Sequence, residues 1–348
     1  MDEGKNGRSG PVGASTMQVD DEWRRWIAEN LLLDSDPASI LQAMLSQGIA
    51  EADACRELDA ARRSPYLAGG DRLRARLKKR NWPLDIQRKL NRLDARMRQV
   101  PKRHRLDGQA FFDDFYVLNR PVVITGMLDD WPALSTWGVD YFRRRFADRQ
   151  VEVQFGRSQD ANYEINQPHL RRSMPFGEYL DLIAAGGQSN DFYMTANNSS
   201  SNRQALAELW QDIGGLPAYL DGQRDSGFLW FGPKGTRTPF HHDLTNNFMA
   251  QLAGRKRIKL VPAVELGQMY NDLHCYTPVD GGAIDYERFP RMRDAQILEV
   301  ILEPGEILFL PVGCWHYVEG LDVSITMSFT NFRWDNDFAS AYDSYHGV

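Results

Sequence analysis

Hydrophobic and polar positions follow a helical periodicity in the first quarter of the chain. From Asp20 to about Arg98 the apolar residues recur every three or four positions, as in DDEWRRWIAENLLL (20–33), which is typical of amphipathic helices. The segments 34–48 and 51–64 continue this pattern, the first opening with capping residues and a proline. Residues 71–100 are predicted to form a basic helical pair broken at Pro83. The pattern therefore predicts an N-terminal helical region over residues 20–98.

Beyond Pro101 the helical periodicity gives way to short apolar runs bounded by glycine and proline. These runs indicate strands and a β-sandwich or barrel. One helix is expected at MPFGEYLDLIAAGG (174–187), and the stretch 264–296 lacks periodicity and is expected to be a long loop. In DVSITMSFTNF (322–332) alternation predicts one packed face and one polar face lining a wet cavity. The predicted strands are PVVITG (121–126), VEVQFG (151–156), DFYMTA (191–196), GFLWFG (227–232), NNFMAQLAG (246–254), KRIKLVP (256–262), ILEVILEPG (297–305), EILFLP (306–311) and DVSITMSFTNF.

The amino-acid composition favours an ordinary globular protein and argues against two other classes, nucleic-acid-binding and membrane-spanning proteins. The 348 residues are 42% hydrophobic and 25% charged, as in an ordinary globular protein. The net charge of -6 argues against broad binding of nucleic acid by the whole surface. No run of about eighteen apolar residues occurs, so a membrane span is not expected. Three scattered cysteines fit a reducing compartment, and we predict a cytoplasmic location. Residues 1–18, rich in Gly, Ser and charge, are expected to be a disordered leader.

One segment, TRTPFHHDLTNNFMAQLAGRKRIKLVP (236–262), carries candidate chemistry. Alternate residues of a strand share a face, so His241 and Asp243 are predicted to point the same way and His242 the opposite way. A third ligand is offered by His316, which follows a tight proline-glycine connection in EPGEILFLPVGCWHYVEG (303–320). Two histidines and one carboxylate on one face of a metal leave three positions open, and this set is typical of non-haem Fe(II) oxygenases. Two open positions suit a chelating 2-oxo acid and one suits O₂.

These motifs also resemble a known family. The run TPFHHD…NNF…QLAGRKR, the later PGEILFLP…WH and the upstream NRPVVITGMLDDWPAL are similar to those of JmjC-domain Fe(II)/2-oxoglutarate oxygenases. The resemblance is closest to the small hydroxylase branch that includes the asparaginyl hydroxylase inhibiting hypoxia-inducible factor. It covers residues 108–335 and implies a mainly β fold: a double-stranded β-helix (cupin or jelly-roll) barrel with flanking helices. Residues 336–348 would then be a C-terminal tail.

The resemblance assigns roles to individual residues. His241, Asp243 and His316 match the iron ligands, and Lys256 matches the lysine that pairs with the distal carboxylate of 2-oxoglutarate. Alternation agrees, because it places Lys256 on an otherwise apolar face, where its charge is costly unless an anion meets it. Three further cofactor-binding positions are implied, and a fourth departs from the family, since Ser328 stands where the nearest relatives often carry asparagine. These four positions are Thr238, Tyr193, Asn247 and Ser328.

The resemblance implies an enzyme that uses Fe(II), 2-oxoglutarate and O₂ to hydroxylate a side chain of a protein or peptide, with succinate and CO₂ as co-products. Two alternatives stay open: a hydroxylase of a small metabolite, with the same catalytic residues, and a non-catalytic metal-binding cupin. We expect a protein or peptide partner, no membrane and no nucleic acid. A homodimer, if it forms, is expected to use the N-terminal helices.

Overall fold

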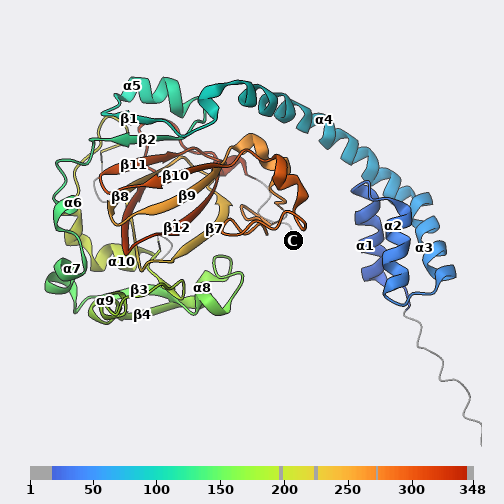
Figure 1. Ribbon diagram of the computed structural model, residues 1–348, viewed down its shortest axis with the longest axis horizontal. Coiled ribbons are helices and arrows are strands. Elements are labelled where there is room, and N and C mark those ends of the chain that lie inside the picture. Colours follow the sequence, from blue (N-terminus) through green and yellow to red (C-terminus); the bar gives the residue numbers. More distant parts are fainter. Residues whose placement is uncertain (1–17, 196–198, 223–225, 272, 343–348) are drawn as a thin grey trace, which may run out of the picture. The chain divides into compact units, whose positions relative to one another are not determined.

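The computed structural model describes residues 18–195, 199–222, 226–271 and 273–342, so the predicted leader and the end of the predicted tail lie almost wholly outside the described residues. The chain divides into two compact units, Met1–Asp85 and Ile86–Val348 (Figure 1). The domain boundaries predicted at residues 20–98, 108–335 and 336–348 stay predictions. None of the described helices is both long and apolar enough to cross a bilayer.

The first unit is a small helical bundle with its own apolar core. It contains α1 (Asp21–Leu32), α2 (Pro37–Ser46), α3 (Glu51–Arg63) and the first part of α4 (Pro65–Leu93). The side chains of Asp20 and Asp36 cap α1 and α2, each accepting a hydrogen bond from a backbone N–H three residues later. The buried core consists of Ile27, Ile40, Met44, Ile49, Ala54 and Leu58. A homodimer through these helices stays a prediction.

Helix α4 corrects one prediction. The expected break at Pro83 is wrong, because α4 continues through this residue to Leu93. A proline inside a helix removes one backbone hydrogen bond and costs about 3 kcal/mol. Arg, Lys, Leu and Gln, which favour helix, occupy most positions on both sides of Pro83, and its exposed ring contacts solvent rather than a packed neighbour.

The second unit is built around two sheets that form the predicted double-stranded β-helix barrel. A six-stranded sheet has the order β1-β2-β11-β8-β13-β6, and a four-stranded sheet has the order β10-β9-β12-β7. The strands are β1 (Lys102–His104), β2 (Val122–Thr125), β6 (Phe228–Gly232), β7 (Arg237–His242), β8 (Asn247–Ala253), β9 (Lys256–Val261), β10 (Leu298–Leu302), β11 (Glu306–Leu310), β12 (Trp315–Gly320) and β13 (Ser324–Phe329). Apolar side chains of both sheets meet in the barrel interior, including Val123, Ile258, Leu260, Leu308 and Val318.

A third sheet and several short helices flank the barrel. The third sheet has the strand order β4-β3-β5, with β3 (Gln150–Phe155), β4 (Arg171–Pro175) and β5 (Phe192–Tyr193). Figure 1 shows β3, β4, α8 and α9 together on one side of the barrel strands. The helical elements of this part are α5 (Gly108–Phe111), a π-helical turn (Phe112–Tyr116), α6 (Pro132–Thr136), α7 (Val139–Phe146), α8 (Gln167–Leu170), α9 (Phe176–Ala184) and α10 (Ser199–Ala205).

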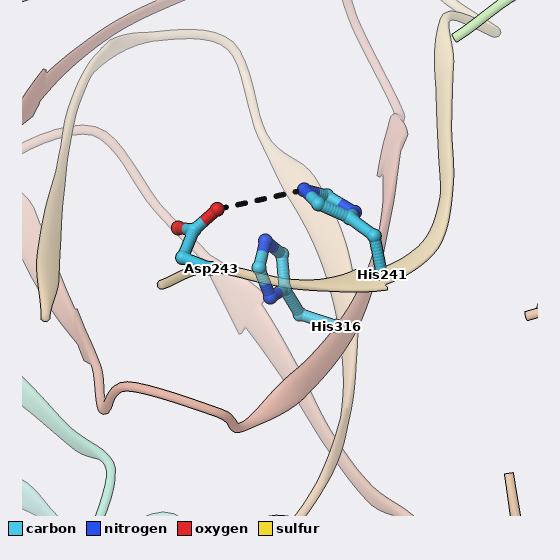
Figure 2. A group of neighbouring side chains, drawn as sticks. All are labelled: His241, Asp243 and His316. Atoms are coloured by element: carbon cyan, nitrogen blue, oxygen red, sulfur yellow. Dashed lines mark ion pairs between the residues drawn. The ribbon is translucent and has the colours of Figure 1, made fainter. Parts of the chain in front are cut away.

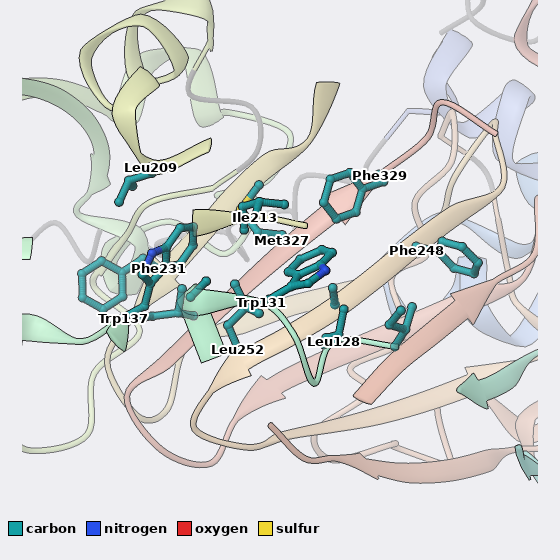
Figure 3. Close-up of a cluster of buried hydrophobic side chains, with 14 of the residues drawn as sticks. Leu128, Trp131, Trp137, Leu209, Ile213, Phe231, Phe248, Leu252, Met327 and Phe329 are labelled. Atoms are coloured by element: carbon teal, nitrogen blue, oxygen red, sulfur yellow. The ribbon is translucent and has the colours of Figure 1, made fainter. Parts of the chain in front are cut away.

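The largest core joins these helices to the six-stranded sheet. Trp131 and Trp137 pack in one cluster with Phe231, Met327 and Phe329, which come from β6 and β13 (Figure 3). Aromatic and aliphatic side chains fill the space, and their burial is the main source of stability for this layer. The helices therefore cover the outer face of the six-stranded sheet and leave the barrel interior to the site described below.

The stretch 264–296 is more ordered than predicted. It contains two 3₁₀ helices, Ala263–Gln268 and Pro290–Asp294, and an apolar cluster that includes Met269, Val279 and Met292. This cluster also takes in Trp315 and Tyr317 of β12. The irregular spacing of its apolar residues hides this packing, because 3₁₀ turns give no helical or strand periodicity.

Candidate metal centre and co-substrate pocket

Three predicted metal ligands meet at one end of the four-stranded sheet. Strands β7 and β12 pair antiparallel with His241 directly opposite His316, and Asp243 follows the end of β7. One ligand atom of each residue lies within 4.8 Å of the others, and Figure 2 shows the three side chains converging. His241 Nε2 is 3.8 Å from Asp243 Oδ1, and the two imidazole rings lie 4.1 Å apart between centroids. The two-residue spacing on β7 and the cross-strand register thus bring together residues that are 73 positions apart in the sequence.

Both histidines are oriented by backbone carbonyls. His241 Nδ1 lies 2.9 Å from the carbonyl oxygen of Pro239, and His316 Nδ1 lies 3.1 Å from that of Cys314. A carbonyl only accepts, so each Nδ1 carries a proton, and Nε2 is the nitrogen of each ring that can face a metal. This arrangement is the usual one for metal-binding histidines, whose second nitrogen donates to a protein oxygen.

The charges of the cluster also suit a cation. Burial alone would raise the pKa of the Asp243 carboxyl, but the neighbouring His316 and His241 and a hydrogen bond from Asn247 lower it overall. Burial, followed by the proximity of His241, lowers the pKa of His316. A carboxylate beside two imidazoles is a donor set that suits a divalent metal.

His242 lies on the other face of β7, as strand alternation predicts. Its ring packs edge-on against Trp315 at 4.7 Å between centroids and lies near Tyr342. Burial lowers the pKa of this imidazole, so His242 is neutral at pH 7 and contributes packing rather than a metal ligand. The structure therefore separates the two adjacent histidines as the sequence indicated.

A buried lysine lies beside the metal centre. Lys256 begins β9, is 2% exposed, and lines a small cavity together with the three predicted ligands. Its Nζ donates to Tyr193 Oη at 3.2 Å, and in the described part of the chain no carboxylate lies within salt-bridge distance of Nζ. Burial lowers the pKa of this ammonium from about 10.5 to about 7. A cation held in an apolar barrel without a counter-ion is the arrangement expected where an anionic ligand completes the site.

The other predicted cofactor residues line the same cavity. Thr238 and Tyr193 are both buried, and burial raises the pKa of the tyrosine, which keeps its phenol protonated. Asn247 donates through Nδ2 to Asp243 Oδ2 at 3.1 Å, while its Oδ1 is buried and has no hydrogen-bond partner among the described residues. Ser328 accepts a 2.8 Å hydrogen bond from Trp230 Nε1. All five predicted cofactor-binding residues therefore surround one space.

The polar face predicted for β13 is only partly correct. Ser324 and Thr326 are fully buried rather than facing a wet cavity, and Thr326 donates to Gln251 Oε1. Only Ser328, at the end of the strand, lines the cavity. The prediction failed because alternation shows which residues share a face but not whether other side chains inside the barrel fill the space in front of that face.

A wider mouth opens above the three ligands and contains residues that the sequence did not single out. Aromatic side chains of Phe228, Trp230 and Tyr276 line it together with the polar Glu164 and Gln167. Tyr276 stacks near the His241 ring at 6.2 Å and pairs with β7 through an isolated bridge. Trp230 carried a usable signal, because alternation in GFLWFG (227–232) places it on one face with Phe228, whereas Glu164 and Gln167 lie in a segment without periodicity.

Comparison with known proteins agrees with the fold. Residues 108–340 match the model of a family described as "Cupin-like domain". The chain belongs to this cupin-like, JmjC-type family. It is 34% identical over 240 residues to lysine-specific demethylase 8 of Xenopus tropicalis, covering 66% of this chain and 52% of that protein. It is 32% identical over 252 residues to lysine-specific demethylase JMJ30 of Arabidopsis thaliana, covering 70% of this chain and 56% of that protein.

A third relative carries a different name. The tRNA wybutosine-synthesizing protein 5 of Gallus gallus is 23% identical over 259 residues, covering 70% of this chain and 80% of that protein. The chain spans only about half the length of the first two relatives. Membership of the cupin-like family is therefore shown, while the nearer resemblance to the asparaginyl hydroxylase branch stays a prediction.

Proposed function

We propose that this protein is an Fe(II)- and 2-oxoglutarate-dependent oxygenase that hydroxylates a side chain of a protein or peptide. The observation that carries the proposal is the buried Lys256, which has no carboxylate partner among the described residues and lies in the same cavity as His241, Asp243 and His316. A metal site alone would fit many cupins. A metal site with a buried cation beside it fits a chelating dicarboxylate.

His241 and His316 would hold the iron through Nε2, and Asp243 through one carboxylate oxygen. Asn247 occupies the other carboxylate oxygen with its hydrogen bond, which favours one-oxygen ligation and fixes the rotamer of Asp243. When bound, the iron and 2-oxoglutarate supply the oxidising power that places one atom of O₂ in a substrate C–H bond and yields succinate and CO₂. The side chains of the protein bind and orient these groups.

Lys256 would pair with the distal carboxylate of 2-oxoglutarate. Tyr193 Oη accepts its hydrogen bond from Lys256, so the phenolic proton remains available for donation to that carboxylate. Thr238, buried in the same cavity, offers a second hydroxyl. These three donors would offset the desolvation of the dianion, and the ammonium is the strongest of them because its bond is charge-assisted.

The wide mouth supports a substrate presented from outside the barrel. Its aromatic walls and polar groups suit an extended side chain, which a protein or peptide would insert while its backbone stays at the surface. The names of two relatives refer to lysine-specific demethylation, which is a reaction of protein side chains. A small-metabolite hydroxylase and a non-catalytic cupin remain the alternatives.

Succinate formation from 2-oxoglutarate with Fe(II) and O₂ tests the proposal, with mass spectrometry of candidate peptides for the gain of one oxygen atom. His241→Ala and Lys256→Ala are expected to abolish turnover, and His104→Ala, which changes an exposed histidine on β1, serves as the matched control. Peptide oxidation by the wild-type protein and by His104→Ala, but not by His241→Ala or Lys256→Ala, supports the proposal. If the wild-type protein neither binds 2-oxoglutarate nor forms succinate, the oxygenase assignment is wrong and the non-catalytic cupin is favoured.

A further inference from the structure

A buried arginine lies behind the co-substrate pocket and plays no part in the site as described so far. Arg157 follows β3 in a short 3₁₀ turn (Arg157–Gln159), and its side chain is 0% exposed. A fully buried guanidinium is rare, because removing its charge from water is costly unless partners satisfy it. Its partners therefore indicate what it does.

The guanidinium donates hydrogen bonds to two oxygen atoms and forms an ion pair with a third, each from a different segment. Nη1 donates to Gln154 Oε1 at 2.6 Å, and Nη2 donates to the carbonyl oxygen of Arg237 at 2.5 Å. Nη2 also lies 3.1 Å from Glu164 Oε1, so a carboxylate offsets the buried charge. Arg237 begins β7 and is followed directly by Thr238, one of the predicted hydroxyl donors to the co-substrate.

The same guanidinium also packs against the other predicted hydroxyl donor. Its central carbon lies 5.1 Å from the centre of the Tyr193 ring and 4.4 Å from the centre of the Tyr163 ring. Tyr163 Oη donates to the Arg237 carbonyl as well, at 3.1 Å. One side chain thus touches the Tyr193 ring and the backbone immediately before Thr238, although these residues are far apart in the sequence.

We propose that Arg157 is a positioning residue for the co-substrate: it holds Tyr193 and Thr238 so that both hydroxyls meet the carboxylate that pairs with Lys256. This inference rests on the proposed function. Arg157 does not line the cavity itself, so it acts through Tyr193 and through the start of β7. Its planar group donates in several fixed directions at once, which a lysine ammonium or an apolar side chain cannot reproduce.

Stability alone does not account for this arginine. A buried ion pair is often replaceable by apolar side chains of similar volume without loss of stability, since desolvation offsets most of the attraction. The Arg157–Glu164 pair is therefore weak evidence for a purely structural role. The convergence of its contacts on the two hydroxyl-bearing segments favours a role in orienting them.

Binding of two 2-oxo acids to the Mn(II)-loaded full chain separates positioning from general damage. 2-Oxoglutarate has the distal carboxylate and pyruvate lacks it, while both have the same chelating end. Arg157→Met is expected to weaken 2-oxoglutarate binding about tenfold, roughly the loss of one well-placed charge-assisted hydrogen bond. Pyruvate binding and Mn(II) binding are expected to change less than about twofold, because the three metal ligands do not touch Arg157.

Two further variants complete the experiment. Arg157→Lys keeps the charge but not the fork of donors, so it is expected to show the same selective loss, and it carries the test if Arg157→Met does not fold. Arg172→Met on β4 removes an exposed arginine from the same three-stranded sheet and is expected to leave both affinities unchanged.

The outcomes are distinct. Selective loss of 2-oxoglutarate affinity in both Arg157 variants supports positioning. An unchanged ratio of 2-oxoglutarate to pyruvate affinity, or an equal loss of both acids and of Mn(II), overturns it. If the wild-type protein itself does not prefer 2-oxoglutarate to pyruvate, the proposed function fails, and this inference fails with it.

Discussion

Replacing Lys256 by methionine is expected to stabilise the ligand-free protein while removing its affinity for 2-oxoglutarate. Lys256 is 2% exposed, and burial lowers the pKa of its ammonium from about 10.5 to about 7. Methionine has a similar length and no charge, so it fits the same face of β9 without the desolvation cost. A residue kept for binding a ligand often costs stability, and this residue offers a direct test.

The size of the effect follows from the pKa. A fall from about 10.5 to about 7 corresponds to about 4 kcal/mol of destabilisation at pH 7. The folded pKa lies below the unfolded pKa, so this penalty is fully present below pH 7 and fades as the pH rises towards 10.5. Imperfect packing of methionine reduces the gain, and we expect about 2 to 4 kcal/mol at pH 7. For a unit of this size that raises the melting temperature by roughly 5 to 10 °C.

Thermal unfolding of the metal-free full chain at pH 6.5, 7.5 and 9 measures the effect. The advantage of Lys256→Met over wild type should shrink at pH 9. With Mn(II) present throughout, added 2-oxoglutarate should raise the melting temperature of wild type more than that of the variant. Lys259→Met is the matched control, since Lys259 lies on the opposite face of β9 and donates to the carbonyl of Gly281. If Lys256→Met melts lower than wild type at pH 6.5, or its difference from wild type does not depend on pH, the account of an unpaired buried charge is wrong.

Four further outcomes are expected. The Lys256 amine, whose pKa is about 7, must be protonated to pair with the carboxylate of 2-oxoglutarate, and less of it is protonated at pH 8 than at pH 7. The affinity for 2-oxoglutarate, measured by titration calorimetry, should therefore fall about fivefold between pH 7 and pH 8. His316→Ala should lose stoichiometric Fe(II) or Mn(II) binding, seen by equilibrium dialysis, while keeping its circular dichroism spectrum. Asn247→Ala frees one oxygen of Asp243 and should weaken metal binding by about 10- to 100-fold in the same assay; unchanged affinity would remove Asn247 from the site. Pro83→Ala restores a backbone donor inside α4 and should stabilise the helical unit against urea by about 1 to 3 kcal/mol, whereas a loss would show that the proline is required.

Strand alternation, turn residues and the resemblance to the JmjC family together allowed the barrel and the candidate metal ligands to be predicted from the sequence. His241 and Asp243 share a side of β7 by spacing alone, and His316 follows a proline-glycine turn that places it at the start of β12. Lys256 was likewise identifiable as a charge on an apolar face. Only the shared face of His241 and Asp243 follows from a period of two; His316 was recognised from the turn motif, and the role of Lys256 from the resemblance to the JmjC family. The cross-strand register of β7 and β12 brings His316 opposite His241.

Other features depend on tertiary packing that no period encodes. The break expected at Pro83 does not occur, because the surrounding helix formers outweigh one missing hydrogen bond. The polar side chains of Ser324 and Thr326 are buried, and Thr326 donates to Gln251 of β8 rather than to a ligand or to solvent. The order of residues 264–296 comes from contacts with Trp315 and Tyr317 rather than from its own pattern.

Arg157 shows where sequence reasoning ends for this site. Its partners come from β3, from β5 and from the start of β7, and they meet only because the three-stranded sheet packs against the barrel. A three-residue 3₁₀ turn has no face that alternation could assign, and an arginine there is normally exposed. The residues predicted to bind the co-substrate were found through the family resemblance, whereas Arg157, the proposed positioning residue, is visible only as a buried charge whose contacts converge. Such charges behind a predicted anion pocket are therefore the places to look for positioning residues in other barrels of this kind.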